Sequence, residues 1–499
     1  MDTCDVLVIG GGPAGSSCAW KLRQAGLDVI VMDRAAFPRD KVCAGWITPQ
    51  VLAAADIDVD DYRRERTCQP ITGFRTGLLG GGREIETVYD HPVSFGIRRC
   101  EFDHYLLQRS TARLKLGAPV ASIRKEQARW IVNDAVTARM LVGAGGHFCP
   151  VARWLNTVNA VNDAAGHAPV VAAQEAEFKI DARDAASLTS VPDTPELYFC
   201  RDFKGYGWCF RKEDYLNVGF GRVDGHALPR ATAEFADFLF ARRKIPRVQS
   251  WRWHGHAYLL SEPPRRRVVD SGVLLVGDAA GLAYAPSGEG IRPAIESGLM
   301  AAATILEAGG DYTRQRIEPY EDRLRARFEL RPGPRPQAET LLSGFAATLL
   351  PALFNVPWFV RHLLLDRWFL RAHESPLALP SACTSPGQRL NHQLVLARNT
   401  FYHGKLKSSA AADPAGEDAA QRMVHRLRLR RDGEGGYSKK VNKLLDHEYV
   451  ITLDISHLPD VREGEEVSMV LPDEVVLGRP PAPNSPLDSS WSSAPVTLR

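Results

Sequence analysis

Three glycines and one aspartate near the N-terminus have the types and the spacing that bind a diphosphate. Gly10, Gly12 and Gly15 form the pattern G-x-G-x-x-G, and an acidic residue, Asp33, follows roughly 20 positions later. Gly10 permits a tight turn, Gly12 lets the backbone approach a pyrophosphate, and Gly15 lets a helix pack closely on a strand. Unpaired N–H groups at the N-terminus of that helix attract phosphate. Asp33 can accept hydrogen bonds from ribose hydroxyls, so the pattern predicts a bound dinucleotide.

The elements around these residues support this interpretation. Residues 6–9 are a short apolar run that predicts a buried parallel strand, and residues 29–32 predict a second one. A helical pattern lies between them and ends at Gly26. An ordinary strand–helix–strand unit with a glycine-rich turn is the alternative. The choice between FAD and NAD stays open on these residues, although a motif that starts at residue 6 is typical of many flavoproteins.

Cys43 is a second candidate for chemistry, in a basic loop that continues as Cys43-Ala44-Gly45. The small residues Ala44 and Gly45 would let the backbone come close to a planar ligand. A thiol has an ordinary pKa of about 8.5 and can act as an acid near that value. Burial as a small apolar side chain is the alternative, and it is the commoner role of a free cysteine.

The composition limits the class of protein. The 499 residues are enough for two or three domains, and a hydrophobic content of 44% with 24% charged residues is ordinary for a globular protein. A net charge of +3 predicts no nucleic-acid partner. Nine cysteines without a C-x-x-C pair or a metal-ligand spacing predict a reducing compartment and no metal site. Since no signal-peptide pattern precedes the first strand, we expect a cytoplasmic protein.

The periodicity of the apolar residues predicts five segments. The first and third form one dinucleotide-binding domain, and the second is an antiparallel sheet inserted into it. The fourth is helical, and the fifth is a linker with a small β element and a disordered tail. Their ranges are 1–165, 166–262, 263–330, 331–404 and 405–499. Within the first segment, residues 71–89 predict a β-hairpin and residues 119–124 predict a strand.

The fourth segment contains residues 341–360, which carry no charge over a length close to that of a membrane span. Pro351 and Pro357 argue against a simple span. Broken amphipathic helices that line an apolar groove or rest on a membrane surface are one interpretation. Ordinary core helices are the other.

Four motifs follow one another in an order that resembles the group A flavoprotein fold of aromatic hydroxylases, flavin halogenases and geranylgeranyl reductases. They are residues 10–15, the Cys43-Ala44-Gly45 loop, residues 143–153, and residues 277–281 with 287–291. The resemblance implies an α/β fold, with a Rossmann-like FAD-binding domain, an inserted antiparallel β-sheet substrate domain and C-terminal helices.

The same resemblance implies which residues hold FAD. Asp278 would contact the ribityl chain, and a helix that starts at Gly290 and Ile291 would point its N-terminus at the flavin. Arg99 matches an arginine that contacts FAD in the family, and Ala121 matches the strand that contacts adenine. The full set of expected cofactor contacts is Gly10, Gly12, Ala14, Gly15, Asp33, Arg34, Ala44, Gly45, Arg99, Ala121, Asp278, Gly290 and Ile291.

Within this fold the chain is most similar to the geranylgeranyl reductase family, over about residues 1–375. Family members carry a Cys-x-Gly loop, which Cys43 and Gly45 match. They also carry two runs that correspond here to Tyr206-Gly207-Trp208-Cys209-Phe210 and Asn217-Val218-Gly219-Phe220-Gly221. The alternating aromatic residues would form a wall over the flavin, and an ordinary aromatic core strand is the alternative.

Three departures from the patterns of this fold bear on the activity. Arg211 stands where the geranylgeranyl reductases usually have proline, and Gly145-Gly146 stand where hydroxylases have Asp-Gly. The halogenase run Trp-x-Trp-x-Ile-Pro is missing from the sequence. The second and third departures weaken a hydroxylase or a halogenase interpretation.

The resemblance implies an FAD-dependent oxidoreductase that reduces C=C bonds of a prenyl chain by hydride transfer from reduced flavin. NADPH or another reductant would be the electron donor, and the substrate would be an apolar small molecule such as a prenyl lipid. Cys43, Tyr206 and Trp208 are the expected catalytic residues, with Cys43 as proton donor or redox-active thiol. A peripheral membrane contact and the oligomeric state stay open.

Two other functions are kept as alternatives. One is a flavin monooxygenase or halogenase-like enzyme that acts on an aromatic or polyketide-like molecule. The other is a flavin-binding protein without catalytic activity.

Overall fold

The computed structural model describes residues 1–157, 170–223, 225–246, 252–259, 266–284, 287–328, 351–377 and 379, together with five short strands after residue 428. The chain divides into two compact units, Met1–Glu374 and Ser375–Arg499. In the second unit, β19 (Leu429–Arg430) pairs with β21 (Glu466–Val467). The other three strands form an antiparallel sheet in the order β20 (Val450–Thr452), β22 (Glu474–Gly478) and β23 (Ala494–Thr497).

The first unit contains an eight-stranded sheet around the N-terminal strand. Its strands are β1 (Asp2–Ile9), β2 (Val29–Met32), β8 (Arg113–Lys115), β9 (Ile123–Glu126), β10 (Arg129–Val132), β11 (Val136–Gly143), β17 (Val269–Asp270) and β18 (Val273–Leu275). β1 lies between β2 and β11 and is parallel to both; β8 continues the parallel pairing beyond β2, and β18 continues it beyond β11. Val6, Leu7 and Val8 have no exposed surface. Both faces of β1 are therefore covered, which explains its unbroken apolar run.

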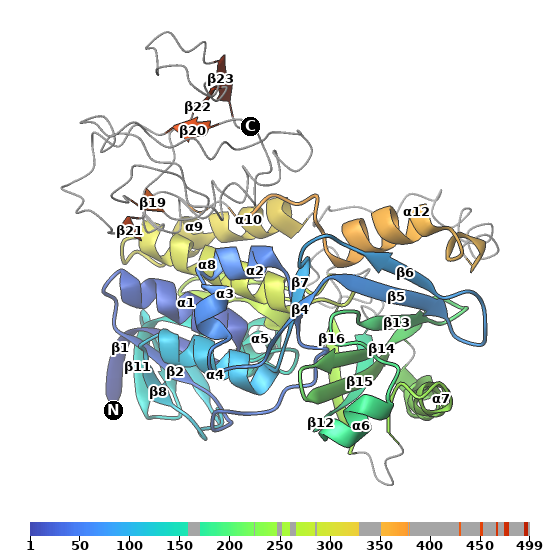
Figure 1. The fold of residues 1–499 in the computed structure, drawn as a ribbon. Coiled ribbons are helices and arrows are strands. Elements are labelled where there is room, and N and C mark those ends of the chain that lie inside the picture. Colours follow the sequence, from blue (N-terminus) through green and yellow to red (C-terminus); the bar gives the residue numbers. More distant parts are fainter. Residues whose placement is uncertain are drawn as a thin grey trace, which may run out of the picture. The chain divides into compact units, whose positions relative to one another are not determined.

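Helices pack on this sheet, and two of them bring their N-termini to the carboxyl ends of its strands. α1 (Pro13–Gln24) and α8 (Ile291–Glu307) lie against each other (Figure 1). A side chain at Gly298 would place its Cβ 2.2 Å from the carbonyl oxygen of Ala14, so only glycine permits this crossing. The other helices of this part are α2 (Pro49–Ala54), α3 (Val59–Tyr62), α4 (Arg99–Arg109), α5 (Pro150–Thr157), α9 (Arg314–Ile317), α10 (Pro319–Phe328) and the 3₁₀ turn η2 (Gly277–Ala279).

A second sheet of seven strands forms the other half of the first unit. Its strands, in spatial order, are β16 (His254–Leu259), β12 (Val170–Lys179), β15 (Tyr215–Arg222), β14 (Gly205–Lys212), β13 (Glu196–Phe199), β5 (Gly73–Leu78) and β6 (Ile85–Val88). All neighbours are antiparallel except β13 and β5, which are parallel. The predicted hairpin of residues 71–89 is confirmed as β5 and β6. The hairpin adds two strands to a sheet that we expected from residues 166–262 alone. The pairing of β5 with β13 is a tertiary contact that no local pattern specifies.

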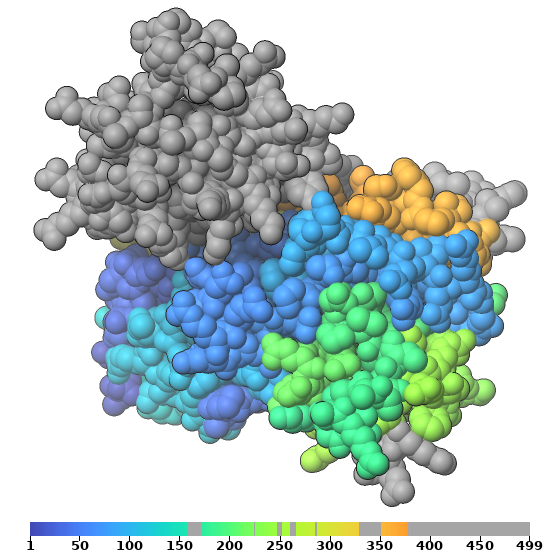
Figure 2. Space-filling model, in the orientation of Figure 1, coloured from blue at the N-terminus to red at the C-terminus, as the bar shows by residue number. Residues whose placement is uncertain are grey.

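The two faces of this sheet are covered by different elements. α7 (Leu228–Ala241) covers one face, where Phe235 packs on Phe220 with ring centroids 5.4 Å apart. The other face carries a cluster of buried aromatic residues, which packs against α12 (Pro357–Phe359) and the π-helical segment η3 (Val360–Phe369). Figure 2 shows residues of this helical segment, in orange, along the blue edge that β5 and β6 form. The remaining elements of the unit are β3 (Trp46–Ile47), β4 (Cys68–Ile71), β7 (Ser94–Ile97), α6 (Ala182–Ser187) and η1 (Gly225–Ala227).

Some expected elements differ from the structure or lie outside its description. The strand expected at residues 119–124 lies later, at Ile123–Glu126, because the Asn133 side chain holds the preceding amides of Ala121 and Ser122 in a loop. Of the apolar run 341–360, only residues 351–360 are described. None of the helices in the described part of the chain is long and apolar enough to cross a bilayer. The five expected segment boundaries stay predictions.

Candidate active site

The glycine loop between β1 and α1 has room for a ligand on one side only. Gly10 has a φ of +115°, and a Cβ there would lie 2.3 Å from the carbonyl oxygen of Ala144. A Cβ at Gly15 would lie 1.9 Å from the carbonyl oxygen of Gly10. A Cβ at Gly12 would meet only the guanidinium of Arg39, at 3.4 Å. The open side of the loop therefore faces the α1 N-terminus and a cation, a combination that suits a diphosphate.

Asp33 orders this loop from the end of β2. Its Oδ2 accepts a hydrogen bond from the Gly11 amide at 2.8 Å, and its Oδ1 accepts one from the Ala35 amide at 2.9 Å. A carboxylate offers about four lone pairs, so two remain for hydroxyl donors. The neighbouring Arg34 is exposed. Ala121 is exposed as well, and its amide donates to Asn133 Oδ1 at 2.7 Å.

Arg99 anchors a charged cluster beside the loop. It is buried and donates to both carboxylate oxygens of Asp103, at 2.8 and 2.9 Å. Arg39 reaches the same carboxylate at 3.2 Å. Burial alone would lower the pKa of Arg99, but Asp103 and the nearby Cys43 thiol raise it, so the guanidinium stays charged. Asp103 thus holds two cations, of which Arg39 extends to Gly12.

A second charged cluster surrounds Asp278. His256 Nε2 lies 3.6 Å from Asp278 Oδ2 and 2.7 Å from Lys41 Nζ. Burial tends to raise the pKa of Asp278, but His256, Lys41 and Arg99 lower it, so the carboxylate is ionised at neutral pH. Burial lowers the pKa of both Lys41 and His256. These three side chains come from a loop, β16 and η2 and form one polar cluster.

The N-terminus of α8 meets the same carboxylate. Gly290 is the residue that caps α8, and a Cβ there would lie 3.2 Å from Asp278 Oδ1. Ile291 begins the helix and is buried. Ala14 is buried in the first turn of α1, where its Cβ lies close to Gly277. The first turns of α1 and α8 and the carboxylate of Asp278 therefore belong to one continuous group of residues.

These observations fit FAD as the bound group. Glycine leaves the backbone open at Gly12 and Gly290, where a ligand with a diphosphate and a polar chain requires close approach. The two guanidinium groups of Arg39 and Arg99 share the single carboxylate of Asp103. An anionic cofactor would balance this surplus of positive charge.

The Cys43 loop connects this region with the second sheet. The Cys43 amide donates to Glu175 Oε2 at 2.6 Å, and Asn217 Nδ2 donates to the Cys43 carbonyl oxygen at 3.2 Å. Gly45 has a φ of +63°, and a Cβ there would lie 2.1 Å from the Ile97 carbonyl oxygen. The loop thus needs glycine at this position and is fixed by two residues of the inserted sheet.

Aromatic residues form the apolar side of the site. Tyr206 and Trp208 have ring centroids 6.0 Å apart, and Tyr206 also lies 5.5 Å from Phe369 of η3. Trp46 stacks on Phe369 at 5.7 Å, and Ala44 packs against the same cluster. The Tyr206 hydroxyl donates to the Ser287 carbonyl oxygen at 2.5 Å, and burial raises its pKa. These aromatic side chains therefore lie next to the Cys43 loop and pack against η3, and their role as a wall over the flavin stays a prediction.

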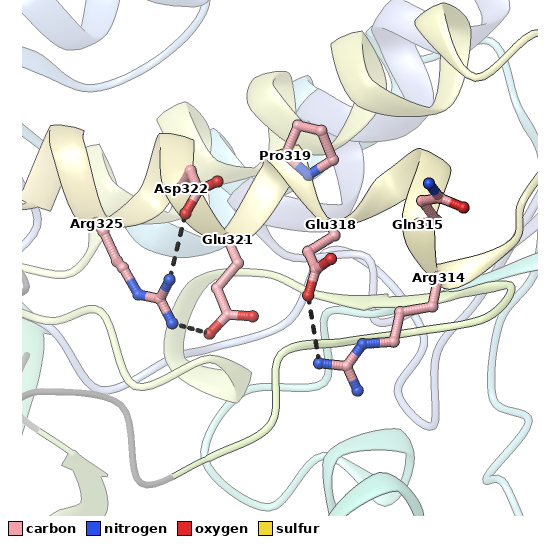
Figure 3. A pocket seen from close by; sticks show the side chains of 7 residues that line it. All are labelled: Arg314, Gln315, Glu318, Pro319, Glu321, Asp322 and Arg325. Carbon is pink, nitrogen blue, oxygen red and sulfur yellow. Dashed lines mark hydrogen bonds and ion pairs between the residues drawn. The ribbon is translucent and has the colours of Figure 1, made fainter.

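A hollow in the described part of the chain lies outside this group of residues. It measures about 320 Å³ and is lined by charged side chains of α9 and α10 (Figure 3). Arg325 pairs there with Glu321 at 2.5 Å and with Asp322 at 3.2 Å. None of the residues expected at the active site lines this hollow, and its charged walls do not suit an apolar substrate.

Several residues of the site were missed in the sequence. Arg39 and Lys41 stand in the basic loop before Cys43, and their charge in a glycine-rich ligand loop was an available signal. Glu175 and His256 gave no usable signal by spacing, and Asn217 was noted only as part of a family run and not as a contact of Cys43, because all three reach the site from distant strands. Their contacts join positions 132 to 215 residues apart.

Comparison with known proteins gives a family match at the N-terminus. Residues 5–77 match the model of the family described as FAD dependent oxidoreductase. This range contains the glycine loop, Asp33 and the Cys43 loop.

Two curated relatives cover more of the chain. The menaquinone reductase of Mycobacterium tuberculosis is 28% identical over 335 residues, which are 61% of this chain and 77% of that protein. The chloroplastic geranylgeranyl diphosphate reductase of Arabidopsis thaliana is 30% identical over 327 residues, which are 60% of this chain and 65% of that protein. The second match agrees with the expected resemblance to the geranylgeranyl reductases.

A solved structure shares the fold. It is a geranylgeranyl bacteriochlorophyll reductase-like protein of Thermoplasma acidophilum, with a TM-score of 0.59 and 24% identity. The similarity covers 72% of this chain and 92% of that one. The expected fold, an FAD-binding α/β domain with an additional sheet, is thereby confirmed.

Proposed function

We propose that this chain, an FAD-dependent oxidoreductase that resembles the geranylgeranyl reductases, reduces C=C bonds of a prenyl chain. The observation that carries the proposal is the position of the Cys43 loop. Its thiol lies close to Arg99 of the charged cluster, and its backbone is held by Glu175 and Asn217 of the second sheet. The loop therefore joins the cofactor side of the site to the aromatic side.

The apolar character of the aromatic side of the site favours an apolar substrate. The cluster on the sheet contains Phe74, Phe199, Phe210 and Phe369 together with Trp46, and its members are carbon-rich surfaces without charge. The two curated relatives are named for a quinone and for geranylgeranyl diphosphate, compounds that carry or consist of prenyl chains. A prenyl lipid is the substrate class that both lines of support share.

The residues of the chain then have distinct roles. Asp33 and the first turn of α1 would bind the cofactor's adenosine diphosphate part, and Asp278 with the N-terminus of α8 would bind the part nearer the flavin. Reduced FAD, when bound, supplies the hydride that adds to one carbon of the double bond. NADPH or another reductant would restore the reduced form. The alkene gains one hydride and one proton, and the cofactor loses two electrons.

Cys43 Sγ is the proposed donor of the proton that the second alkene carbon takes. The guanidinium of Arg99 stabilises the thiolate that remains, because the cation is buried beside it. Solvent returns a proton to the thiolate. Tyr206 and Trp208 orient the chain from the sheet, and the hydrogen bond of Tyr206 to Ser287 fixes its ring.

Single-turnover reduction tests this proposal. Protein reduced with dithionite is mixed without oxygen with prenyl compounds and, separately, with aromatic compounds. We expect reoxidation of the flavin and a hydrogenated product with a prenyl compound. Cys43→Ser should keep its FAD and slow product formation by about 10²–10⁴-fold, the usual contribution of general acid catalysis. Cys100→Ser, in a half-buried cysteine of α4, is the matched control.

Three results would contradict the proposal. Oxygen uptake coupled to NADPH oxidation in the presence of an aromatic compound would favour the monooxygenase alternative. Stable FAD binding without turnover of any compound would favour a binding protein. Wild-type turnover by Cys43→Ser would remove the thiol from the reaction.

A further inference from the structure

We propose that Asn217 and Glu175 are positioning residues, which hold the Cys43 peptide at both ends so that the inserted sheet sets the place of the thiol. The inference concerns the same site and rests on the proposed role of Cys43. Asn217 binds the carbonyl oxygen of Cys43 and Glu175 binds its amide. Two contacts, one at the amide and one at the carbonyl oxygen, restrain the backbone of this residue at both ends.

The orientation of the Asn217 amide follows from its partners. Trp208 Nε1 lies 2.7 Å from Asn217 Oδ1, and an indole nitrogen can only donate. The amide oxygen must therefore face Trp208, which leaves Nδ2 to face acceptors. Nδ2 lies 3.2 Å from the Cys43 carbonyl oxygen and 3.2 Å from Glu177 Oε1. Each of its two hydrogens has an acceptor, so the network permits one orientation.

Glu175 supplies the second contact from the neighbouring strand. Asn217 lies on β15 and Glu175 on β12, and the side chain of Glu175 is 7% exposed. Burial, together with the nearby carboxylate of Glu177, raises the pKa of Glu175 to about 8, although Lys212 opposes the shift. A neutral carboxyl still offers a carbonyl oxygen to the Cys43 amide. The contact is therefore present at neutral pH without a buried charge.

An ion pair of Lys212 and Glu177 supports Asn217 and Glu175, the two residues that we call the clamp of the Cys43 peptide. Lys212 Nζ donates to Glu177 Oε1 at 2.9 Å and to the Ile97 carbonyl oxygen at 2.9 Å. Arg98 also reaches Glu177, at 3.3 Å. The ion pair of Lys212 and Glu177 thus lies next to the neutral carboxyl of Glu175. The sheet residues that contact Cys43 cannot shift without breaking these buried hydrogen bonds.

The network also connects the substrate wall with the thiol. Trp208 lies in the aromatic cluster on the sheet, and two hydrogen bonds connect its indole nitrogen through Asn217 to the Cys43 carbonyl oxygen. A prenyl chain that packs on Trp208 would bias the same hydrogen bonds that hold Cys43. The sheet thus couples the place of the substrate to the place of the proposed proton donor.

The labelling rate of Cys43 tests the clamp independently of turnover. The full-length protein with bound FAD is treated with iodoacetamide, and the peptides that contain Cys43 and Cys100 are quantified by mass spectrometry. Asn217→Asp keeps an acceptor for Trp208 but offers no donor to the Cys43 carbonyl. We expect Cys43 labelling to rise about fivefold, the factor for one lost hydrogen bond, while the rate at Cys100 stays constant.

A pair of variants at Glu175 provides a second measurement that does not depend on Asn217. Glu175→Gln retains an acceptor for the Cys43 amide and should therefore label like the wild type. Glu175→Ala should label faster and reduce kcat with little change in KM. Asn156→Asp is the matched control for Asn217→Asp, because Asn156 joins two distant backbone segments outside this network.

The outcomes separate the clamp from the proposed function. Wild-type labelling in Asn217→Asp and in Glu175→Ala would overturn the clamp. If Asn217→Asp loses FAD, the two Glu175 variants decide alone, and equal labelling of Glu175→Ala and Glu175→Gln would then overturn the clamp. Faster labelling with wild-type turnover would support the clamp and refute the role of Cys43 as proton donor.

Discussion

Replacement of Glu175 by glutamine should change how the stability of the protein depends on pH. The carboxyl of Glu175 is buried and has a pKa of about 8, against an ordinary value of 4.5. The folded protein therefore retains a proton that the unfolded chain releases above pH 4.5. The free energy of unfolding must fall as the pH rises through the window between these two values.

The magnitude follows from the two pKa values. The linkage relation gives a cost of about 1 kcal/mol at pH 5.5 and about 4 kcal/mol at pH 7.5, so Glu175 removes about 2–3 kcal/mol between them. Glu177 does not contribute in this window, because its pKa is lowered by Lys212 and Asn217 despite its burial. Burial raises the pKa of Glu289 to about 7, which acts in the same direction but is common to both proteins.

Urea unfolding at pH 5.5 and pH 7.5, followed by tryptophan fluorescence, measures the effect. Glu175→Gln has no proton to release, so its loss of stability between the two pH values should be smaller than that of the wild type by about 2–3 kcal/mol. Glu318→Gln, in an exposed residue between α9 and α10, serves as a control and should follow the wild type. An equal loss in Glu175→Gln and the wild type would refute the buried neutral carboxyl.

Two further predictions concern the cofactor and the units of the chain. Asp33→Ala and Asp278→Ala should each weaken FAD binding by about 1.5–3 kcal/mol, the usual contribution of a hydrogen bond to a charged group, as measured by titration of the apoprotein with FAD. Unchanged affinity in both variants would contradict the assigned contacts. A chain that ends after Glu374 should still bind FAD, because every proposed contact lies in the first unit. Loss of flavin from a folded truncated chain would show that the second unit contributes to the site.

The sequence allowed good prediction where a residue's role is decided by its immediate neighbours. Gly10 was assigned to a tight turn and has a φ of +115°, which a side chain rarely allows. Gly45 was expected to let the backbone approach a ligand; its φ of +63° and the Ile97 carbonyl oxygen, 2.1 Å from a Cβ position, show that the protein's own backbone also requires glycine there. Such constraints exclude every residue but glycine and therefore leave a mark in the sequence. The alternation of Tyr206 and Trp208 likewise placed both on one face of β14.

Contacts between distant strands could not be predicted in the same way. His256 meets Lys41 across 215 positions, and the pairing of β5 with β13 joins a hairpin to a sheet from another segment. A glutamate at position 175 fits the exposed side of an antiparallel strand as well as a buried hydrogen bond. Only the packed sheet determines that Glu175 is buried against the Cys43 amide.

The charges around the site argue that the cofactor completes the fold of this region. Lys41 and Asp278 are partly removed from water, and burial of each is costly unless opposite charge lies nearby. Arg39 and Arg99 share a single carboxylate, that of Asp103, which leaves positive charge in excess. A diphosphate near Arg39 would neutralise this excess and relieve the cations that now compete for Asp103. Binding of FAD should therefore stabilise the loop of residues 39–45 at its charged end, whereas Asn217 and Glu175 hold its other end at Cys43.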